Sequence, residues 1–302
     1  MNPRLDTLVT ALYVRIDDLL AENPGWAPER PAVGFKPKLA DAELVTLAVI
    51  SALLGFDSES RFVRWAKAHL RAWFPYLPNR DGYNKRLRRA GHMIARVIER
   101  LARECPDWGD DVWLVDSTPV ECGRSRQTQR RSDLAGWAQY GWCASHSRFF
   151  WGLRLHLIAT PSGLPVAFAL ADAKADEREV CAEMIARAGI ARAGQTLIAD
   201  KGYRSAAFER QLNDAGITVI RPATRAEPPR PGARFLRPLR QIIESVNNTL
   251  KTQLSLERHR GRTKAGVAAR VLTRILALTA AIWHNQTTHQ PGPARSLTAY
   301  DH

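Results

Sequence analysis

Apolar residues recur at helical spacing through the first third of the chain. This spacing predicts helices over residues 5–20, 42–54, from 58 onward and 83–104. Asp41 is expected to cap the second helix, and Gly55 to end it. A Pro-Asn-Arg-Asp-Gly turn at residues 78–82 precedes the longest of these helices. The first third is therefore predicted to be an all-α region.

The pattern changes near Cys105-Pro106, where we place a domain boundary. Beyond it, short apolar or alternating runs predict strands over residues 112–115, 149–160, 164–170, 195–199 and 217–221. Helices are expected over residues 176–191, 205–215, around Glu244 and 263–285, and a long loop over 121–148. Three strands followed by alternating strands and helices indicate an α/β domain with a mixed sheet. The predicted division is a helical domain, 1–106, and a catalytic domain with C-terminal helices, 107–302.

The charge is strongly positive, with 44 Lys and Arg against 30 Asp and Glu, a formal net charge of +14. Such an excess favours a polyanionic partner, and nucleic acid is the first candidate, although a merely soluble basic protein is the alternative. The expected DNA contacts are two arginine clusters, Arg124, Arg126, Arg130 and Arg131, and then Arg258, Arg260 and Arg262. The helix from Tyr83 is also basic at its start, which suits a DNA-binding helix or a solvated face, and we expect the helical domain, residues 1–106, to carry the recognition of DNA ends.

The four cysteines are scattered and form no C-x-x-C pair, which argues against a zinc knuckle or a disulfide framework. The acidic N-terminal stretch does not resemble a signal peptide. The apolar stretch 265–283 contains Arg270 and Arg274, which makes it a poor membrane span. We expect a cytoplasmic, nucleoid-associated protein that has no membrane partner.

Two aspartates follow buried apolar runs. Asp116 comes after Val-Trp-Leu-Val at residues 112–115, and Asp200 after Thr-Leu-Ile-Ala at 196–199. Active groups of open α/β sheets gather at the carboxyl ends of strands, so both positions suit chemistry. For either residue alone, a role as a cap or turn former is an equal alternative.

A third carboxylate, Glu244, lies on a predicted helix. At about 100° per residue, Arg240, Asn247 and Lys251 fall on its side of that helix. The alternative is a surface ion pair between Arg240 and Glu244, four residues apart.

Three carboxylates without His or Cys partners suit Mg²⁺ or Mn²⁺ rather than zinc. A pair of such ions activates the attacking oxygen and stabilises the leaving one in phosphodiester transfer. Arg240 and Lys251 would then hold phosphates beside Glu244.

The chain contains three further short motifs, Asp116-Ser-Thr-Pro, Trp151-Gly-Leu-Arg-Leu-His156 with Gly163-Leu-Pro165, and Ala199-Asp-Lys-Gly-Tyr203. Together they resemble those of the bacterial insertion-sequence DDE transposases, with the insertion-sequence 982 family as the nearest branch. Arg240, Glu244 and Lys251 reproduce R-x₃-E-x₆-K, most of a signature of related elements. Arg237 stands where that signature has tyrosine.

The resemblance implies a ribonuclease H-like catalytic domain with two Mg²⁺ ions held by Asp116, Asp200 and Glu244. It implies binding of double-stranded DNA, both the terminal inverted repeats of an element and the target. A homo-oligomer would bring the two ends together. Lys201 would contact phosphate, whereas His156 is either a neighbour of the metal site or a half-buried, hydrogen-bonded strand histidine.

The function that follows is transposition, cleavage at element ends and then strand transfer into target DNA. A nuclease or resolvase on the same fold would share the carboxylate chemistry. A domesticated or defective transposase that only binds DNA is the remaining alternative, and the intact Asp, Asp and Glu argue against it.

Overall fold

The chain divides into two compact units. The computed structural model describes residues 3–30, 36–143, 147–225, 227–230 and 232–300, without the side chains of 233–235. Residues 1–104 and 250–302 cluster as one unit, called here the helical unit, and residues 105–249 as the other, called the sheet unit.

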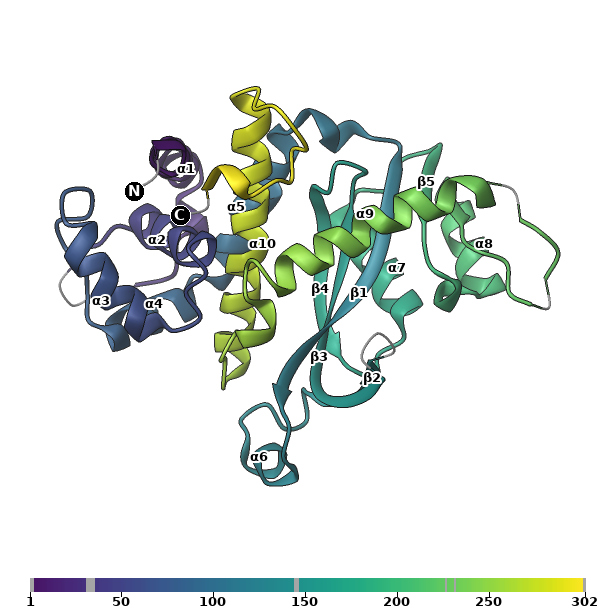
Figure 1. Cartoon of the computed structure of the whole chain (residues 1–302), viewed down its shortest axis with the longest axis horizontal. Helices are drawn as coiled ribbons and strands as arrows, with labels where there is room; N and C mark the ends of the chain where they lie inside the picture. The colour runs from purple at the N-terminus through teal and green to yellow at the C-terminus, as the bar shows by residue number, and fades with distance from the viewer. Residues whose placement is uncertain (1–2, 31–35, 144–146, 226, 231, 301–302) are drawn as a thin grey trace. The chain divides into compact units, whose positions relative to one another are not determined.

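The helical unit is built around its last long helix. Its helices are α1 (Pro3–Glu22), α2 (Asp41–Leu53), α3 (Glu59–His69), α4 (Arg80–Arg89), α5 (Gly91–Glu104) and α10 (Lys264–Thr287). Short 3₁₀ turns occur at η1 (Pro24–Trp26), η5 (Leu256–Arg258) and η6 (Thr298–Tyr300). The α10 helix contacts α1, α2, α4 and α5 (Figure 1). It is apolar on nearly all sides, so it needs partners around it.

This packing differs from the predicted division of the chain. The boundary near residue 106 lies close to the observed one, but residues 250–302 cluster with the N-terminal helices rather than with the catalytic part. Among the helices that the structure describes, α10 is long and apolar enough to cross a membrane, yet 78% of its most apolar stretch is buried in the protein. Its burial explains why the C-terminal segment returns to the helical unit.

Two details of the predicted helices were wrong. The helix expected over residues 83–104 is two helices, α4 and α5, which meet at Ala90 before Gly91. Glycine is a poor helix former, and this one lies against Leu272 of α10. The cap of α2 is Ala40 and not Asp41. The carboxylate of Asp41 is instead buried and paired with Arg30 and Arg86.

Among the residues that the structure describes, the sheet unit contains six strands in one mixed sheet. They are β1 (Val112–Gly123), β2 (Gln139–Cys143), β3 (Arg148–Ala159), β4 (Pro165–Asp172), β5 (Gln195–Ile198) and β6 (Ile217–Ile220). The helices are α6 (Arg126–Arg131), α7 (Glu177–Ala188), α8 (Ala206–Asp214) and α9 (Ala233–Lys251), which runs on into the helical unit. The 3₁₀ turns are η2 (Pro106–Gly109) and η4 (Lys201–Tyr203).

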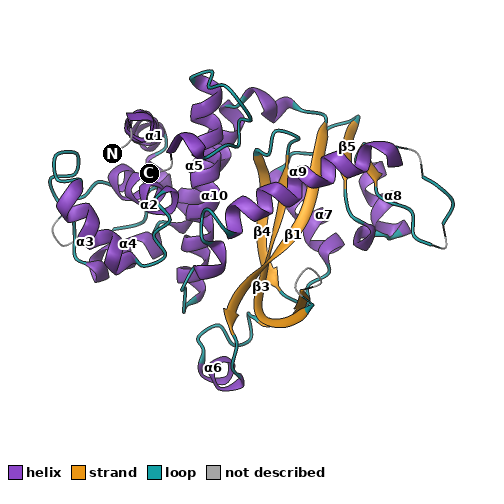
Figure 2. Ribbon diagram, viewed as in Figure 1, coloured by secondary structure: helices purple, strands orange, loops and turns teal. Residues whose placement is uncertain are grey.

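The strand order is β2-β3-β1-β5-β6, and β4 also pairs with β3. Figure 2 shows the sheet in orange, with β1, β3, β4 and β5 labelled. The β3 strand is antiparallel to its neighbours β1 and β4, whereas β5 pairs in parallel with β1, and β6 with β5. The mixed α/β sheet predicted from the sequence is therefore confirmed.

The two faces of β1 have different partners. Trp113 and Val115 belong to a core cluster that includes Met184 of α7 and Phe208 of α8. Because side chains alternate along a strand, Asp116 points to the opposite face, where its carboxylate meets α9. The central strand thus carries a packed core on one side and a polar site on the other.

The β1 strand is longer than predicted, so Asp116 lies within it rather than at its end. The long loop expected over residues 121–148 contains α6 and β2, and its residues 144–146 lie outside the described residues. Gly152 explains the tight pairing of β3 with β1, because a Cβ there would lie 2.2 Å from the carbonyl oxygen of Val120.

Candidate active site

Asp116 accepts two hydrogen bonds, and the charges of two other carboxylates act on it. The Ser117 amide donates to its Oδ1, and Nδ2 of Asn247 on α9 donates to its Oδ2, each over 2.8 Å. Burial raises the pKa of Asp116 to about 6, the negative charges of Asp200 and Glu177 add to the rise, and the two hydrogen bonds oppose it. Asp116 therefore sits where added positive charge would stabilise it.

Asp200 follows β5 at the same edge of the sheet. Leu114 pairs with Ile198 in parallel register, and continuing that register sets Asp116 opposite Asp200. Neighbouring strands lie about 4.8 Å apart, so Asp200 lies beside Asp116 and its charge acts on that carboxyl group. Asp200 caps η4, accepting a 2.8 Å hydrogen bond from the Gly202 amide at its Oδ1.

Glycine at position 202 leaves space for this cap. A Cβ there would lie 2.9 Å from Oδ1 of Asp200, closer than real Cβ contacts. The Asp-Lys-Gly sequence therefore has a steric basis, because the glycine leaves room for the aspartate to turn back onto its own backbone.

Glu244 stands apart from the aspartate pair. Its side chain is 58% exposed and lies 3.5 Å from Arg240, as in the surface ion pair that the sequence left open. Among the described residues, no three or more His, Cys, Asp or Glu side chains are grouped to hold a metal ion. Glu244 is nevertheless only three residues from Asn247, which is about 4.5 Å along the helix axis and about 60° around it.

The atoms around Asp116 fit a hard divalent cation. Oδ1 of Asn247 is buried and has no hydrogen-bond partner among the described residues, although Nδ2 of the same amide reaches Asp116. Asp116, Asp200 and this amide offer oxygen donors only, the set that Mg²⁺ and Mn²⁺ prefer. A cation there would satisfy the unpaired oxygen and relieve the repulsion between the carboxylates.

Glu177 is a residue that the sequence patterns did not assign to the site. Asp176 is the cap of α7, whereas Glu177 accepts a 2.6 Å hydrogen bond from the Ser117 hydroxyl. Arg154 donates to Ser117 Oγ over 2.9 Å and pairs with Glu177 over 3.2 Å. These three side chains hold β1 and β3 to the start of α7 directly behind Asp116. Ser117 lies opposite His156 because β1 pairs with β3, and no motif of consecutive residues reveals this pairing.

Two further motif residues are buried. His156 has no exposed surface, and neither ring nitrogen has a hydrogen-bond partner among the described residues, so the hydrogen-bonded histidine that we expected is absent there. Burial lowers its pKa to about 4, and nearby Arg154 adds to this, so the ring is neutral at pH 7. Burial also raises the pKa of Tyr203 well above its usual value, so both residues pack as neutral side chains.

The predicted basic contacts are divided between the two units. Arg126, Arg130 and Arg131 lie exposed on α6, as does Lys201 on η4. Arg124 is also exposed, and it pairs with Glu121 over 2.6 Å. Four other residues predicted to contact DNA belong to the helical unit: Lys251, Arg258, Arg260 and Arg262.

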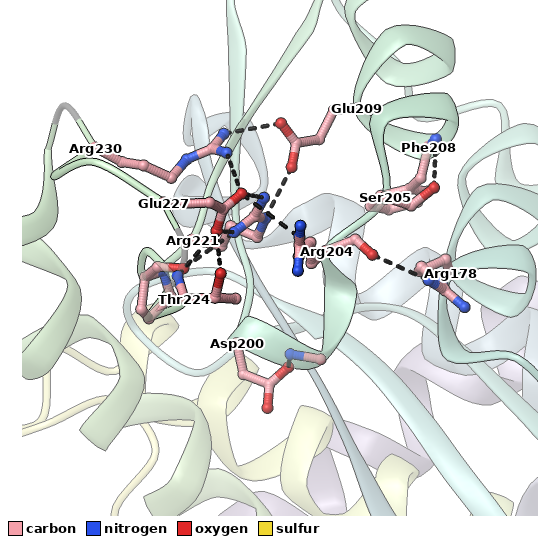
Figure 3. Close-up of polar contacts among 12 residues, drawn as sticks. Arg178, Asp200, Arg204, Ser205, Phe208, Glu209, Arg221, Thr224, Glu227 and Arg230 are labelled. Carbon is pink, nitrogen blue, oxygen red and sulfur yellow. Dashed lines mark hydrogen bonds and ion pairs between the residues drawn. The ribbon is translucent and has the colours of Figure 1, made fainter.

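A second group of charges, called here the Arg221 cluster, lies near Asp200 (Figure 3). It consists of Arg221, Glu209, Glu227 and Arg230. The Arg221 guanidinium is 2% exposed and donates to both oxygens of Glu227, over 2.7 and 2.9 Å, and to Glu209 over 2.7 Å. Glu227 also accepts from the amide and hydroxyl of Thr224. The cluster fastens the segment between β6 and α9.

The sequence matches the family described as transposase DDE domain over residues 107–280, more than half of the chain. A cryo-EM structure of a piggyBac transposase synaptic complex with hairpin DNA is similar over 97% of this chain and 77% of that one, with 10% identity and a TM-score of 0.44. No protein of curated function matches the sequence. The strand order and the family match confirm the ribonuclease H-like prediction. The protein belongs to the insertion-sequence-type DDE transposases.

Proposed function

We propose that this protein cleaves DNA at the ends of an insertion element and joins the freed 3′ ends to target DNA, using Asp116, Asp200 and Glu244. The observation that supports this most is the hydrogen bond between Asn247 and Asp116, 2.8 Å long. It ties α9 to β1, so that Glu244 is one helical turn from a residue that touches the aspartate pair.

Each side chain has a part in this proposal. Asp116 and Asp200 would bind Mg²⁺ or Mn²⁺, and Glu244 would join them by turning away from Arg240. When bound, two such ions would neutralise the charge that develops on the phosphate during in-line transfer. Arg240, released from its 3.5 Å contact with Glu244, would then be free to hold a phosphate oxygen.

The residues behind Asp116 position it. Arg154 and Ser117 fix Glu177, whose negative charge, together with that of Asp200, favours a cation at Asp116. Asn247 holds one oxygen of Asp116, and the Ser117 amide holds the other. The carboxylate is therefore oriented before a ligand arrives, which is the arrangement that catalysis by positioning requires.

The finer assignments are part of the same proposal. The expected partners are double-stranded DNA with the terminal inverted repeats of an element of the insertion-sequence 982 type, and a second copy of the chain that synapses the two ends. Its place is the cytoplasm, on the nucleoid. The net charge of +14 supports a nucleic-acid partner. A nuclease or resolvase would use the same carboxylates but would release its products without joining them.

The test uses purified protein and duplexes that carry the ends of the flanking element. Mg²⁺ and Mn²⁺ are expected to support cleavage and joining, Ca²⁺ to support binding with little turnover, and chelator to abolish both reactions. Asp116→Asn and Asp200→Asn should lose cleavage. Product mapping separates the alternatives: cleavage without joining indicates a nuclease, and full activity in chelator contradicts the proposed site.

A further inference from the structure

A cavity of about 380 Å³ lies within the helical unit, away from the aspartate pair in sequence. Its walls come from the start of α3, one side of α4, the loop before α10 and the first turns of α10, among them Asp57, Glu59, Arg88, Arg262 and Arg270. The α4 helix and α10 are direct neighbours (Figure 1). All the lining residues are polar or charged, with no aliphatic or aromatic side chain among them. A cavity that lacks aliphatic and aromatic side chains is poorly suited to a base or another flat organic group.

Positive charge exceeds negative charge around this cavity. Its lining holds five arginines and three acidic residues. Asp57 pairs with Arg260 and Glu59 with Arg270, each over 2.7 Å. Arg80 and Asp81 form a third pair. All three carboxylates are therefore already matched by lining arginines.

Two cations are left over at the cavity. Arg88 and Arg262 have no acidic partner among the described residues of the helical unit, and both line the space. Arg274, four residues after Arg270 on α10, is 5% exposed, and burial lowers its pKa to about 10, while Glu59 and Asp57 oppose the shift. The acidic residues thus face an additional buried cation, which leaves Arg88 and Arg262 still less compensated.

Two helix starts also open onto the cavity. Ser58 caps α3, and Thr263 caps α10 by accepting a hydrogen bond from the Gly266 amide over 3.1 Å. The stem of Arg88 passes over Gly266, where a Cβ would lie 3.7 Å from its Cδ. The positive ends of two helix dipoles therefore add to the unpaired arginines, a combination that favours phosphate.

The loop before α10 is held in a defined shape. Arg260 has a φ of 54°, and the Gly261 amide donates to the buried His259 ring over 3.0 Å. A Cβ at Gly261 would lie 2.8 Å from backbone atoms of Val267. Arg262 is consequently presented from a compact turn at the rim, exposed to solvent.

We infer that this cavity binds one or two backbone phosphates of duplex DNA, through Arg88 and Arg262. The inference rests on the proposed function, since it assigns a DNA contact to a DNA-cutting protein. The exposed position of Arg262 suits a strand that passes across the surface. The site combines α3 and α4 with residues 260–270, so residues 1–106 alone do not contain it, although we expected them to carry recognition.

The test compares DNA binding by the full-length double variant Arg88→Gln, Arg262→Gln with that of the wild type in Ca²⁺, over a range of salt. Each phosphate contact contributes about 0.9 to the slope of log affinity against log salt, so a fall in slope of about 1–2 is expected. Affinity should fall about tenfold at about 0.15 M salt, for element-end and scrambled duplexes alike. Arg262→Lys, which keeps the charge, should retain most of the slope.

The matched control is Arg64→Gln with Arg71→Gln, two exposed arginines of the helical unit outside the cavity. An unchanged slope in the cavity variant, or an equal loss in the control, overturns the inference. A second outcome would show that the ligand is free phosphate and not DNA. In that outcome, inorganic phosphate raises the melting temperature of the wild type, but the cavity variant binds DNA as well as the wild type does. Thermal unfolding verifies that the variants fold.

Mg²⁺-dependent cleavage by the wild type on the same duplexes shows separately whether the proposed function holds. A wild type that neither binds nor cuts them overturns both.

Discussion

The sheet unit contains two groups of carboxylates, and only one of them has its negative charge compensated by arginine. In the Arg221 cluster, the guanidinium of Arg221 donates to Glu209 and to both oxygens of Glu227. These bonds hold the pKa of Glu227 below its usual value. At Asp116, burial raises the pKa to about 6, and Asp200 and Glu177 add their negative charges. Figure 3 shows Asp200 beside the Arg221 cluster, with no hydrogen bond or ion pair drawn between them.

The difference separates a structural use of charge from a functional one. A carboxylate that is fully bonded to arginine contributes to the folded state and has little capacity left for a ligand. A buried carboxylate beside others of like charge costs stability, and that cost is recovered when a cation binds. We therefore expect changes at the two places to have opposite effects on stability.

The largest effect on stability is expected from Arg221→Gln. Removing one partner of a buried ion pair leaves charges without compensation, and with Glu209 and Glu227 partly exposed we expect a loss of about 3 kcal/mol. Urea unfolding followed by tryptophan fluorescence measures it. Arg210→Gln, an exposed position on α8, is the control and should change the free energy of unfolding by less than about 0.5 kcal/mol. Equal effects at the two positions would show that the cluster is not structural.

A gain in stability is expected from Asp116→Asn in chelator at pH 7. The folded pKa is above the usual value, so the wild type loses stability as pH rises from about 4 to about 6, and the variant avoids that loss. The expected gain is about 2 kcal/mol, less than the full shift implies because Asp116 is partly exposed. Flipping the Asn247 amide would let its unpaired oxygen accept a hydrogen bond from the amide group that the substitution introduces.

The pH dependence of unfolding verifies the sign. The difference between Asp116→Asn and the wild type should be present above about pH 6 and vanish below about pH 4. Saturating Mg²⁺ should stabilise the wild type and narrow the gap. If the variant were less stable than the wild type at pH 7 in chelator, the negative charge of Asp116 would not be the destabilising feature that we infer.

The smallest effect is expected from Gly202→Ala. The added Cβ would stand 2.9 Å from Oδ1 of Asp200 and displace that carboxylate. Loss of the cap should cost about 1 kcal/mol, and misplacement of Asp200 about tenfold in cleavage rate. Gly109→Ala is the control, because a Cβ there meets nothing within 4 Å and its φ is not positive. Cleavage assays and thermal unfolding of both variants make the comparison. Full activity in Gly202→Ala would show that Asp200 has room to move.

Most of the sheet was predictable because its signals are local. Alternating residues in β3 and β4, the turn at Gly163, and the caps Asp176 and Ser205 are written in consecutive residues. The extent of β1 was not predictable, since its polar second half is held by pairing with β3. The return of α10 to the N-terminal helices depends on packing between segments far apart in the chain.

The site was predictable only in part. Strand position and motif resemblance select Asp116 and Asp200, and the parallel register of β1 and β5 brings them together. The role of Glu177 was missed because a carboxylate in the first turn of a helix looks like dipole stabilisation. Its bonds to Ser117 and Arg154 join segments that are 60 and 23 residues away, so only the folded chain reveals them.

The central claim is that Glu244 completes the aspartate pair, and Glu244→Gln tests it most directly. Rates of Mg²⁺-dependent end cleavage are measured beside DNA affinity in Ca²⁺, with Glu183→Gln, an exposed glutamate on α7, as the matched control. We expect Glu244→Gln to lose about three orders of magnitude in cleavage at unchanged or improved affinity, because the charge that a cation needs is gone. Near-normal cleavage by folded Glu244→Gln protein would contradict this claim, and would leave Glu244 as no more than the surface partner of Arg240.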